Sequence, residues 1–220
     1  TSSVVNLAGE MTVVGVFANL GNSSNIIIES TELNTGSLIV EGISTANITV
    51  ERYLSSGQWH FLAPSVNGVT TQDFYYNHNP DVYASYYDES LNSWEYLSGL
   101  TDPMPLGTGY KMWVADAKSP VTPEMEGSIR TTDLSVNLTT DGTTEWSGWN
   151  LIGNPFSSSL RCDHASWGIN NNTAGAFYVW DSTYNGGDYR YWSGVAGTLD
   201  TVIPISQSFF VYAESAGSYT

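Results

Sequence analysis

Short hydrophobic runs, separated by polar turn-forming residues, recur along the whole chain. Many runs alternate apolar and polar positions or are rich in Val, Ile, Tyr and Trp, which is typical of β-strands. Gly, Asn, Ser, Thr and Pro fill the segments between them and indicate turns. Thr71–Phe74 has the pattern of a single helical turn, and residues 163–167 hold the matching place further along the chain. The pattern therefore predicts an all-β protein.

The first 54 residues carry such runs at Thr12–Phe17, Asn25–Glu29, Ser37–Val40 and Asn47–Val50. The last three runs begin about 10 to 12 residues apart, a spacing that suits the rungs of a β-solenoid. A plain β-meander is the alternative. We expect residues 1–54 to form short β-solenoid-like N-terminal rungs.

From residue 55 onward the same order of sequence features occurs twice. Gly57–Pro64 (GQWHFLAP) and Trp146–Phe156 (WSGWNLIGNPF) each place a Trp-containing strand before a proline. Self-similarity of this kind points to repeated structural units. In the second unit, Asn185–Gly187 is a strong hairpin turn signal between two aromatic strands.

Further features match in the same order. Val82–Asp88 with Ser93–Leu97 corresponds to Ala176–Asp181 with Tyr189–Trp192, and both pairs are expected to be hairpins. Gly127–Ile129 matches Gly217–Tyr219, and an alternating strand is predicted at Ser128–Thr131. Many short strands with frequent turns favour a β-sandwich. We expect a duplicated antiparallel β-sandwich, jelly-roll-like, with repeats at 55–142 and 143–220, the second truncated at its C-terminus.

The segments TVERYL, GQWHFLAP, GWNLIGNPF, FYVWD and PISQSFFVYA together resemble a region of large Bacteroidetes extracellular proteins of the type IX secretion cargo kind. Those proteins include adhesins, hydrolases and their accessory modules. The resemblance implies an extracellular or cell-surface location and neighbouring domains in a larger parent protein. It implies no catalytic residues for this chain.

The excess of acidic over basic residues excludes some classes of binding partner. Six Lys and Arg stand against 22 Asp and Glu, which gives a formal charge of −16 and an isoelectric point near 4.1. Such a surface repels nucleic acid and anionic membranes, so neither is an expected partner. No apolar segment is long enough to insert into a membrane. The one cysteine, Cys162, permits no intramolecular disulfide and is expected to be a packed residue.

Catalytic and metal-binding patterns are weak in this sequence. Asp88, Asp181 and Asp188 could supply a glycosidase pair, but Asp88 and Asp181 hold matching positions in the two repeats. That match favours a shared structural role in the turns. His60, His78 and His164 show no metal-ligand spacing, and His60 is expected to pack within a strand. We expect no catalysis and no cofactor, and leave open a structural calcium ion bound by loop carbonyls and one or two Asp.

Aromatic residues carry the strongest functional signal. The chain has 14 Tyr and 8 Trp against 7 Phe, and Tyr and Trp suit sites that are half apolar and half wet. Alternation places Tyr189 and Tyr191 on one face of their strand and Arg190 and Trp192 on the other. The candidate ligand-binding residues come from the two hairpins: Trp180, Asp181, Tyr184, Asp188, Tyr189, Arg190, Tyr191, Trp192, Tyr86, Tyr87 and Trp94.

The structural alternative is that these rings only stabilise the sheets, since cross-strand aromatic pairs do so without a ligand. Trp59, Trp149, Trp113 and Tyr212 are the residues we assign to the core. The favoured function is a non-catalytic carbohydrate-binding module of a secreted or cell-surface bacterial protein, with a polysaccharide as its ligand. The alternative is a structural spacer or adhesin stalk module without a ligand of its own.

Overall fold

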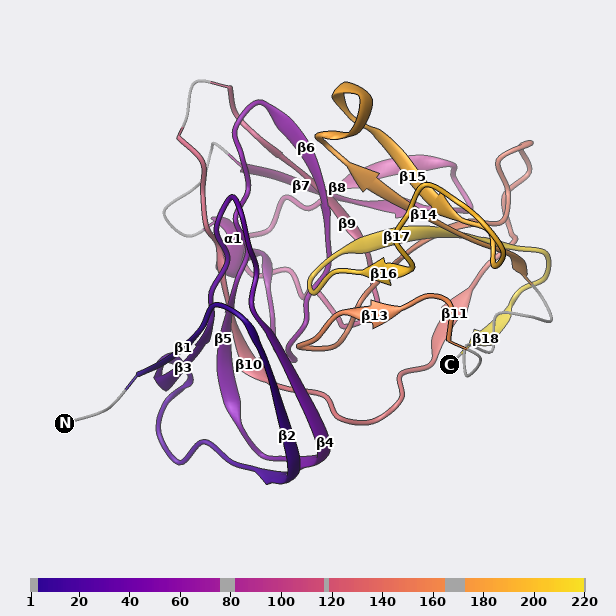
Figure 1. The fold of residues 1–220 in the computed structure, drawn as a ribbon. Coiled ribbons are helices and arrows are strands. Elements are labelled where there is room, and N and C mark those ends of the chain that lie inside the picture. The colour runs from indigo at the N-terminus through magenta and orange to yellow at the C-terminus, as the bar shows by residue number, and fades with distance from the viewer. Residues whose placement is uncertain (1–3, 76–81, 117–118, 165–172, 220) are drawn as a thin grey trace.

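The computed structural model describes residues 4–75, 82–116, 119–164 and 173–219. This part of the chain consists mainly of β-strands in several small sheets (Figure 1). Its helical elements are short: α1 (Thr71–Tyr75), at the predicted helical turn, and single 3-10 turns at Ser23–Asn25 and Tyr184–Gly186. None of the described helices is long and apolar enough to span a bilayer. The predicted all-β class is confirmed.

The N-terminal part contains two sets of parallel strands. β1 (Val5–Leu7), β3 (Ile26–Ile28) and β5 (Asn47–Glu51) pair in parallel in one sheet, and β2 (Glu10–Phe17) pairs in parallel with β4 (Ser37–Ser44) in another. Strands that follow one another in sequence therefore belong to different sheets. This pairing differs from a plain β-meander, in which each strand would pair antiparallel with the next.

β5 connects this N-terminal part to the rest of the chain. It pairs antiparallel with β10 (Glu124–Ser128), which extends the sheet to the order β1-β3-β5-β10. One hydrophobic core contains buried side chains from both sides of residue 54, among them Ile28, Val50 and Met112. The expected boundary at residue 54 therefore lies within a shared core.

The position of β10 corrects one strand prediction. The pattern predicts a strand at Ser128–Thr131, whereas the strand spans Glu124–Ser128. Met125 points into the core between exposed Glu124 and Glu126, so the alternation is present. The two outward positions, however, are glutamates, which are uncommon in strands. For this reason the sequence around Met125 resembles a loop, and the strand is predicted too late in the chain.

An antiparallel sheet, which we call the first sheet, follows in the order β6-β9-β7-β8. Its strands are β6 (Gln58–Leu62), β7 (Val82–Asp88), β8 (Ser93–Tyr96) and β9 (Tyr110–Val114). β7 and β8 form the predicted hairpin. Tyr110, Met112 and Val114 on β9 are buried and alternate with half-buried Lys111 and Trp113, so the two faces of the sheet have different neighbours.

A second sheet has the corresponding order β12-β17-β14-β15. It is built from β12 (Trp149–Gly153), β14 (Thr173–Asp181), β15 (Asp188–Trp192) and β17 (Ser208–Ala213). Two short antiparallel pairs lie beside it: β11 (Val136–Leu138) with β18 (Gly217–Tyr219), and β13 (Leu160–Arg161) with β16 (Val202–Ile203). Since β11 pairs with β18, the expected boundary at residue 142 separates two paired strands.

The first and second sheets pack against each other through aromatic side chains. Phe61, Leu151 and Phe210 are buried at the centre of this inter-sheet cluster. The partly buried members around them are Tyr87, Trp94, Trp149, Tyr178, Trp180 and Tyr189. The far face of the first sheet belongs to the core that contains Ile28, Val50 and Met112, which we call the N-terminal core. The far face of the second sheet belongs to a separate core that includes Phe177 and Phe209.

Backbone hydrogen bonds also join the two sheets. Leu62 at the end of β6 forms a bridge with Gln207, and Ile152 on β12 forms a bridge with Thr108. The Gln207 side-chain amide donates to the carbonyl oxygen of Phe61 at 2.8 Å. Each sheet is therefore held by the segment that leads into the other sheet, and the two form one packed unit.

Candidate functional site

An open cleft of about 350 Å³ lies at one end of the inter-sheet cluster. Its volume is in the range of small-ligand sites. Eight described residues line it, of which seven are aromatic and none is charged. We call it the aromatic cleft, and its lining residues are Tyr87, Asn92, Trp94, Trp146, Trp149, Tyr178, Tyr189 and Phe210.

The β7–β8 hairpin supplies one wall of the cleft. Tyr87 and Trp94 lie directly opposite each other in the strand register, and their ring centroids are 5.4 Å apart at 62°. Asn92 occupies the turn with a φ of 51°, a conformation that Asn tolerates better than most residues. The Tyr87 hydroxyl donates to Asn92 Oδ1 at 2.6 Å, which fixes the tip of this wall.

The second sheet supplies the opposite wall. The Trp149 ring lies 5.1 Å from that of Tyr178 and 6.2 Å from that of Phe210, both edge to face. Tyr191 stacks beside Tyr178 at 6.1 Å with an interplanar angle of 28° and is 41% exposed. Tyr191 therefore extends the aromatic surface from the cleft toward solvent.

A buried carboxylate positions the segment that carries Trp146. Glu89, in the β7–β8 turn, is 5% exposed, and its Oε1 accepts hydrogen bonds from Gly148 N–H at 2.7 Å and the Ser147 hydroxyl at 3.0 Å. The N–H groups of Asp141 and Gly142 also donate to this carboxylate, at 2.9 and 3.2 Å. One turn of the first half of the chain thus holds the loop at 141–148.

The protonation state of Glu89 follows from these contacts. Burial by itself raises the pKa of the carboxyl, but the hydrogen bonds from Gly148 and its neighbours outweigh burial and hold the pKa below its ordinary value of 4.5. Glu89 is therefore ionised at neutral pH. Trp146, which is 54% exposed, is carried at the rim of the cleft by this anchored loop.

The cleft offers hydrogen-bonding groups at the edges of its rings. Within the described residues, no acceptor binds the indole N–H of Trp94, Trp146 or Trp149. Burial raises the pKa of Tyr189 to about 12, so its hydroxyl stays protonated at neutral pH. The arrangement can stack on an apolar ring face and donate hydrogen bonds to oxygen atoms around it.

The cleft does not have the groups that hydrolysis of a glycoside would use. No carboxylate from the described part of the chain lines it, whereas glycosidases place two carboxylates around the scissile bond. Across the described residues, no three His, Cys, Asp or Glu side chains converge as metal ligands. A calcium ion bound mainly by loop carbonyls stays an open prediction. His60 lies within β6 with Nε2 2.8 Å from the Ser55 carbonyl oxygen, and burial lowers its pKa, whereas His78 is outside the described residues.

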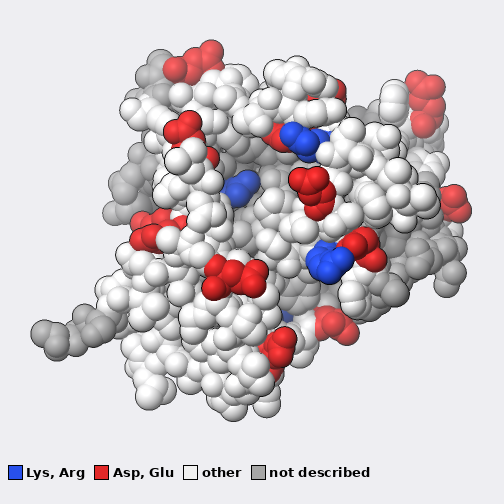
Figure 2. Space-filling model, in the orientation of Figure 1, with Lys and Arg blue, Asp and Glu red and all other residues white. Residues whose placement is uncertain are grey.

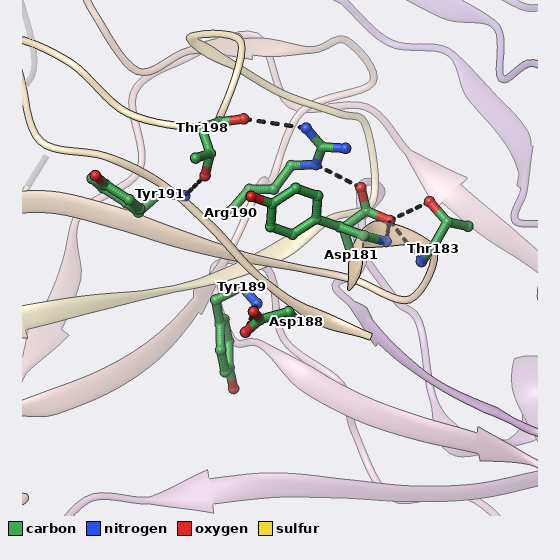
Figure 3. Close-up of polar contacts among 8 residues, drawn as sticks. Asp181, Thr183, Asp188, Tyr189, Arg190, Tyr191 and Thr198 are labelled. Atoms are coloured by element: carbon green, nitrogen blue, oxygen red, sulfur yellow. Dashed lines mark hydrogen bonds and ion pairs between the residues drawn. The ribbon is translucent and has the colours of Figure 1, made fainter. Parts of the chain in front are cut away.

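The β14–β15 hairpin holds a polar network on the side away from Tyr189 (Figure 3). Arg190 Nε lies 2.7 Å from Asp181 Oδ2, and Arg190 Nη1 donates to the Thr198 carbonyl oxygen at 3.2 Å. The Arg190 guanidinium stacks over the ring of Tyr184 at 4.3 Å. These groups bind one another rather than face the aromatic cleft.

Asp88 and Asp181 perform the same structural role at the two hairpin turns, as their matched positions predict. Asp88 Oδ1 accepts from the Ser90 hydroxyl at 2.7 Å and from Leu91 N–H at 3.1 Å, and these bonds lower its pKa. Asp181 Oδ1 accepts from Thr183 N–H at 2.8 Å. Burial raises the pKa of Asp181, but the bonds from Thr183 and Arg190 outweigh it and lower the pKa overall.

The other predicted site residues lie in different environments. Trp180 is packed between the sheets, and its Nε1 donates to the Trp59 carbonyl oxygen at 3.0 Å. Tyr86 packs on the N-terminal core and Trp192 on the core beyond the second sheet. Asp188 is exposed and accepts a hydrogen bond from Tyr189 N–H. Of the predicted residues, only Tyr87, Trp94 and Tyr189 line the aromatic cleft.

Five of the cleft residues are not among the ligand-binding residues that the sequence predicts. Trp149 was assigned to the core, and it is in fact partly buried at the cleft wall. Asn92, Trp146, Tyr178 and Phe210 received no role. The available signal was alternation along Phe177–Trp180, which places Tyr178 on the face opposite Phe177 and Val179. Nothing local indicates that Trp146 would meet the β7–β8 hairpin.

Cys162 gives a direct check of packing at the second sheet. Cys162 is 5% exposed, and burial raises the pKa of its thiol to about 11. At pH 8 we expect alkylation by iodoacetamide to be roughly 100-fold slower in the native protein than in urea, because the thiolate is the reactive form. Mass spectrometry over time measures both rates. Equal rates would contradict the buried position of Cys162.

Charge lies mainly outside the cleft. The face in Figure 2 shows carboxylates dispersed among large uncharged areas, with few basic groups. Scans against protein-family models, curated proteins and solved structures find no match to this chain. Its function must therefore be argued from the site.

Proposed function

We propose that this chain is a non-catalytic module that binds a neutral polysaccharide in the aromatic cleft. The observation that carries the proposal is an open cleft of about 350 Å³ to which the described residues contribute seven aromatic side chains and no charged one. A sugar ring presents an apolar C–H face and a rim of hydroxyls. Aromatic faces match the first, and indole and phenol donors match the second.

The wider architecture that we propose is a duplicated β-sandwich preceded by solenoid-like rungs. Two observations support the duplication. The two sheets share one strand order, and Gly127 pairs with Ile48 on β5 as Gly217 pairs with Leu138 on β11. For the rungs, the support is the alternation of β1 to β5 between two sets of parallel strands.

The resemblance to Bacteroidetes secreted proteins supports a proposal about where the protein is located. We place the module in a secreted or cell-surface protein with neighbouring domains. Its acidic surface is suited to a soluble module outside the cell and disfavours nucleic acid as a partner.

A spacer or adhesin stalk without a ligand is the second candidate. It is favoured by the inter-sheet cluster, in which Phe61 contacts four other rings and leaves most of them buried or half-buried. In a spacer, the cleft would be a gap left by packing rather than a ligand site.

Affinity electrophoresis tests the binding proposal. We expect at least one neutral soluble polysaccharide to retard the protein, and Trp146→Ala to weaken that binding by about 10- to 100-fold, because a large ring no longer covers the sugar. Trp146 is 54% exposed, so its removal should leave the fold intact. The same screen is run with calcium and with a chelator, and insoluble polysaccharides are tested by pull-down.

Tyr184→Ala is the matched control, since Tyr184 is an aromatic residue of the second hairpin that does not line the cleft. Its affinity should equal that of the wild type. If no neutral polysaccharide binds, or if Trp146→Ala binds as well as the wild type, the cleft is not the site and the spacer becomes the better description.

A further inference from the structure

A second aromatic surface lies on the first sheet, beyond the inter-sheet cluster. Trp59, Trp113 and Tyr83 are neighbours in the strand register of β6, β9 and β7, so their side chains lie in one row on the same face. The rings of Trp59 and Trp113 are 5.2 Å apart. Tyr83 is 47% exposed, and Tyr96 on β8 is 64% exposed. None of these four residues lines the aromatic cleft.

Lys111 lies on this same face, two residues before Trp113 on β9. Its Nζ is 4.0 Å from the ring centroid of Trp94 and 4.5 Å from that of Trp59, within cation–π distance of both. Within the described part of the chain, the ammonium makes no hydrogen bond or ion pair. We call Trp59, Trp113, Tyr83, Tyr96 and Lys111 the first-sheet strip.

The other described basic side chains already bind acceptors of the protein. This makes Lys111 different in a chain where basic groups are few. The pairs are Arg52 with Gln207 Oε1, Arg130 with the carbonyl oxygens of Thr132 and Asp133, Arg161 with Asp163, and Arg190 with Asp181.

Comparison of the two sheets shows that packing does not require a lysine at position 111. Lys111 lies opposite Phe61 on β6, and Phe210 lies at the corresponding position opposite Leu151 on β12. Phe210 is buried among rings, as an apolar residue at this position should be. Burial of an ammonium is unfavourable and lowers the pKa of Lys111. A charge kept at such a position is typical of a functional site.

A second polar group beside Lys111, the hydroxyl of Ser85, also makes no hydrogen bond among the described residues. Ser85 lies directly opposite Lys111 in the strand register and is fully buried. Its hydroxyl has no hydrogen-bond partner among the described residues. Buried polar groups are normally paired, so this part of the strip is not optimised for stability alone.

We propose that the first-sheet strip is a second glycan-binding site, selective for sugars that carry an oxyanion, either a carboxylate or a sulfate. The sugar rings lie along Trp59, Trp113 and Tyr83, and Lys111 pairs with the anionic group. Charge complementarity at Lys111 is what selects this ligand class over a neutral glycan. This inference extends the proposed function to a second ligand class and uses a different surface.

The test uses polygalacturonate as the carboxylated probe, a sulfated galactan as the second probe, and a neutral glycan as the comparison. Titrations by calorimetry are made at about 0.15 M salt, where charges more than about 8 Å apart are largely screened, since the protein as a whole repels polyanions. We expect the wild type to bind one or both anionic probes. Lys111→Met should weaken this binding by about 10- to 100-fold, because it removes a charge-assisted contact while keeping an unbranched side chain.

Lys111→Arg keeps the charge and should keep most of the affinity, and Tyr83→Ala, at an exposed position, should weaken it. Neutral-glycan binding should be unchanged in Tyr83→Ala, because Tyr83 does not line the aromatic cleft, so the two sites can fail separately. The inference is overturned if neither anionic probe binds the wild type, or if Lys111→Met binds them unchanged while its unfolding curve matches that of the wild type. Absence of neutral-glycan binding alone would reject only the aromatic cleft.

Discussion

Replacing Glu89 by alanine should destabilise the protein by about 3–5 kcal/mol. The substitution leaves the N–H groups of Asp141, Gly142 and Gly148 and the hydroxyl of Ser147 without the acceptor that they share. These hydrogen bonds are buried or partly buried. A buried donor that loses its acceptor lowers the stability of the fold. Urea unfolding, followed by tryptophan fluorescence, measures the loss.

Glu95→Ala is the matched control. Glu95 lies in the same hairpin, on β8, but it is half-buried and accepts only the Ser93 hydroxyl in the described structure. Its replacement should cost less than about 1 kcal/mol. A Glu89→Ala variant as stable as Glu95→Ala would show that the loop at 141–148 is not held by the carboxylate.

The same carboxylate should make stability depend on pH in the acid range. The pKa of Glu89 is lower in the folded state than its ordinary value of 4.5. Its contribution is therefore complete above pH 4.5 and is lost as the pH falls through the lower, folded-state pKa. We expect the stability difference between the wild type and Glu89→Gln to narrow below pH 4.5. A difference that is constant from pH 7 to pH 3 would contradict this role.

Glu89 also links the stability of the fold to the candidate site. The loop that it holds carries Trp146 at the rim of the aromatic cleft. Glu89→Gln retains the size of the side chain but replaces one acceptor oxygen with a donor amide, so it should loosen this loop while the protein remains folded. Weaker glycan binding in this variant would then arise from the position of Trp146 and not from loss of a ligand contact.

Local features of the fold could be predicted from the sequence because they depend on neighbours along the chain. The hairpins at Val82–Tyr96 and Thr173–Trp192 follow from alternation and turn residues, and Asp181 caps its own turn. β10 was misplaced because glutamates occupy its outward positions. The sequence does not predict that residues before and after residue 54 share one core. That core forms because β5 pairs with β10, and the strands of the first sheet lie between them in the sequence.

The aromatic cleft was predictable only in part, and for a related reason. Tyr87, Trp94 and Tyr189 lie in the hairpins that the aromatic pattern singles out. Trp146 and Phe210 meet them only when the two sheets pack, which no local pattern specifies. For Lys111 the signal was present, since alternation on β9 puts its side chain on the same face as Trp113.

Phe61→Ala should be the most damaging substitution in the inter-sheet cluster. The Phe61 ring is 6% exposed and lies 5.6 Å from the ring of Trp94, 5.7 Å from Trp180 and 6.1 Å from Phe210. Its removal leaves a cavity between the two sheets and should cost about 3–5 kcal/mol. For a chain of this size, that corresponds to a fall in Tm of about 6–20 °C.

The shape of the Phe61→Ala unfolding transition distinguishes two descriptions of the protein. If the sheets are one packed unit, as the bridges from Leu62 to Gln207 and from Thr108 to Ile152 indicate, the variant should unfold in a single transition at a lower temperature. Two separate transitions by calorimetry would mean that each half folds alone. Phe61→Leu, which keeps most of the volume, should cost less than about 1.5 kcal/mol. Since the cleft takes one wall from each sheet, Phe61→Ala should also weaken glycan binding at temperatures where the variant remains folded, whereas Phe61→Leu should not.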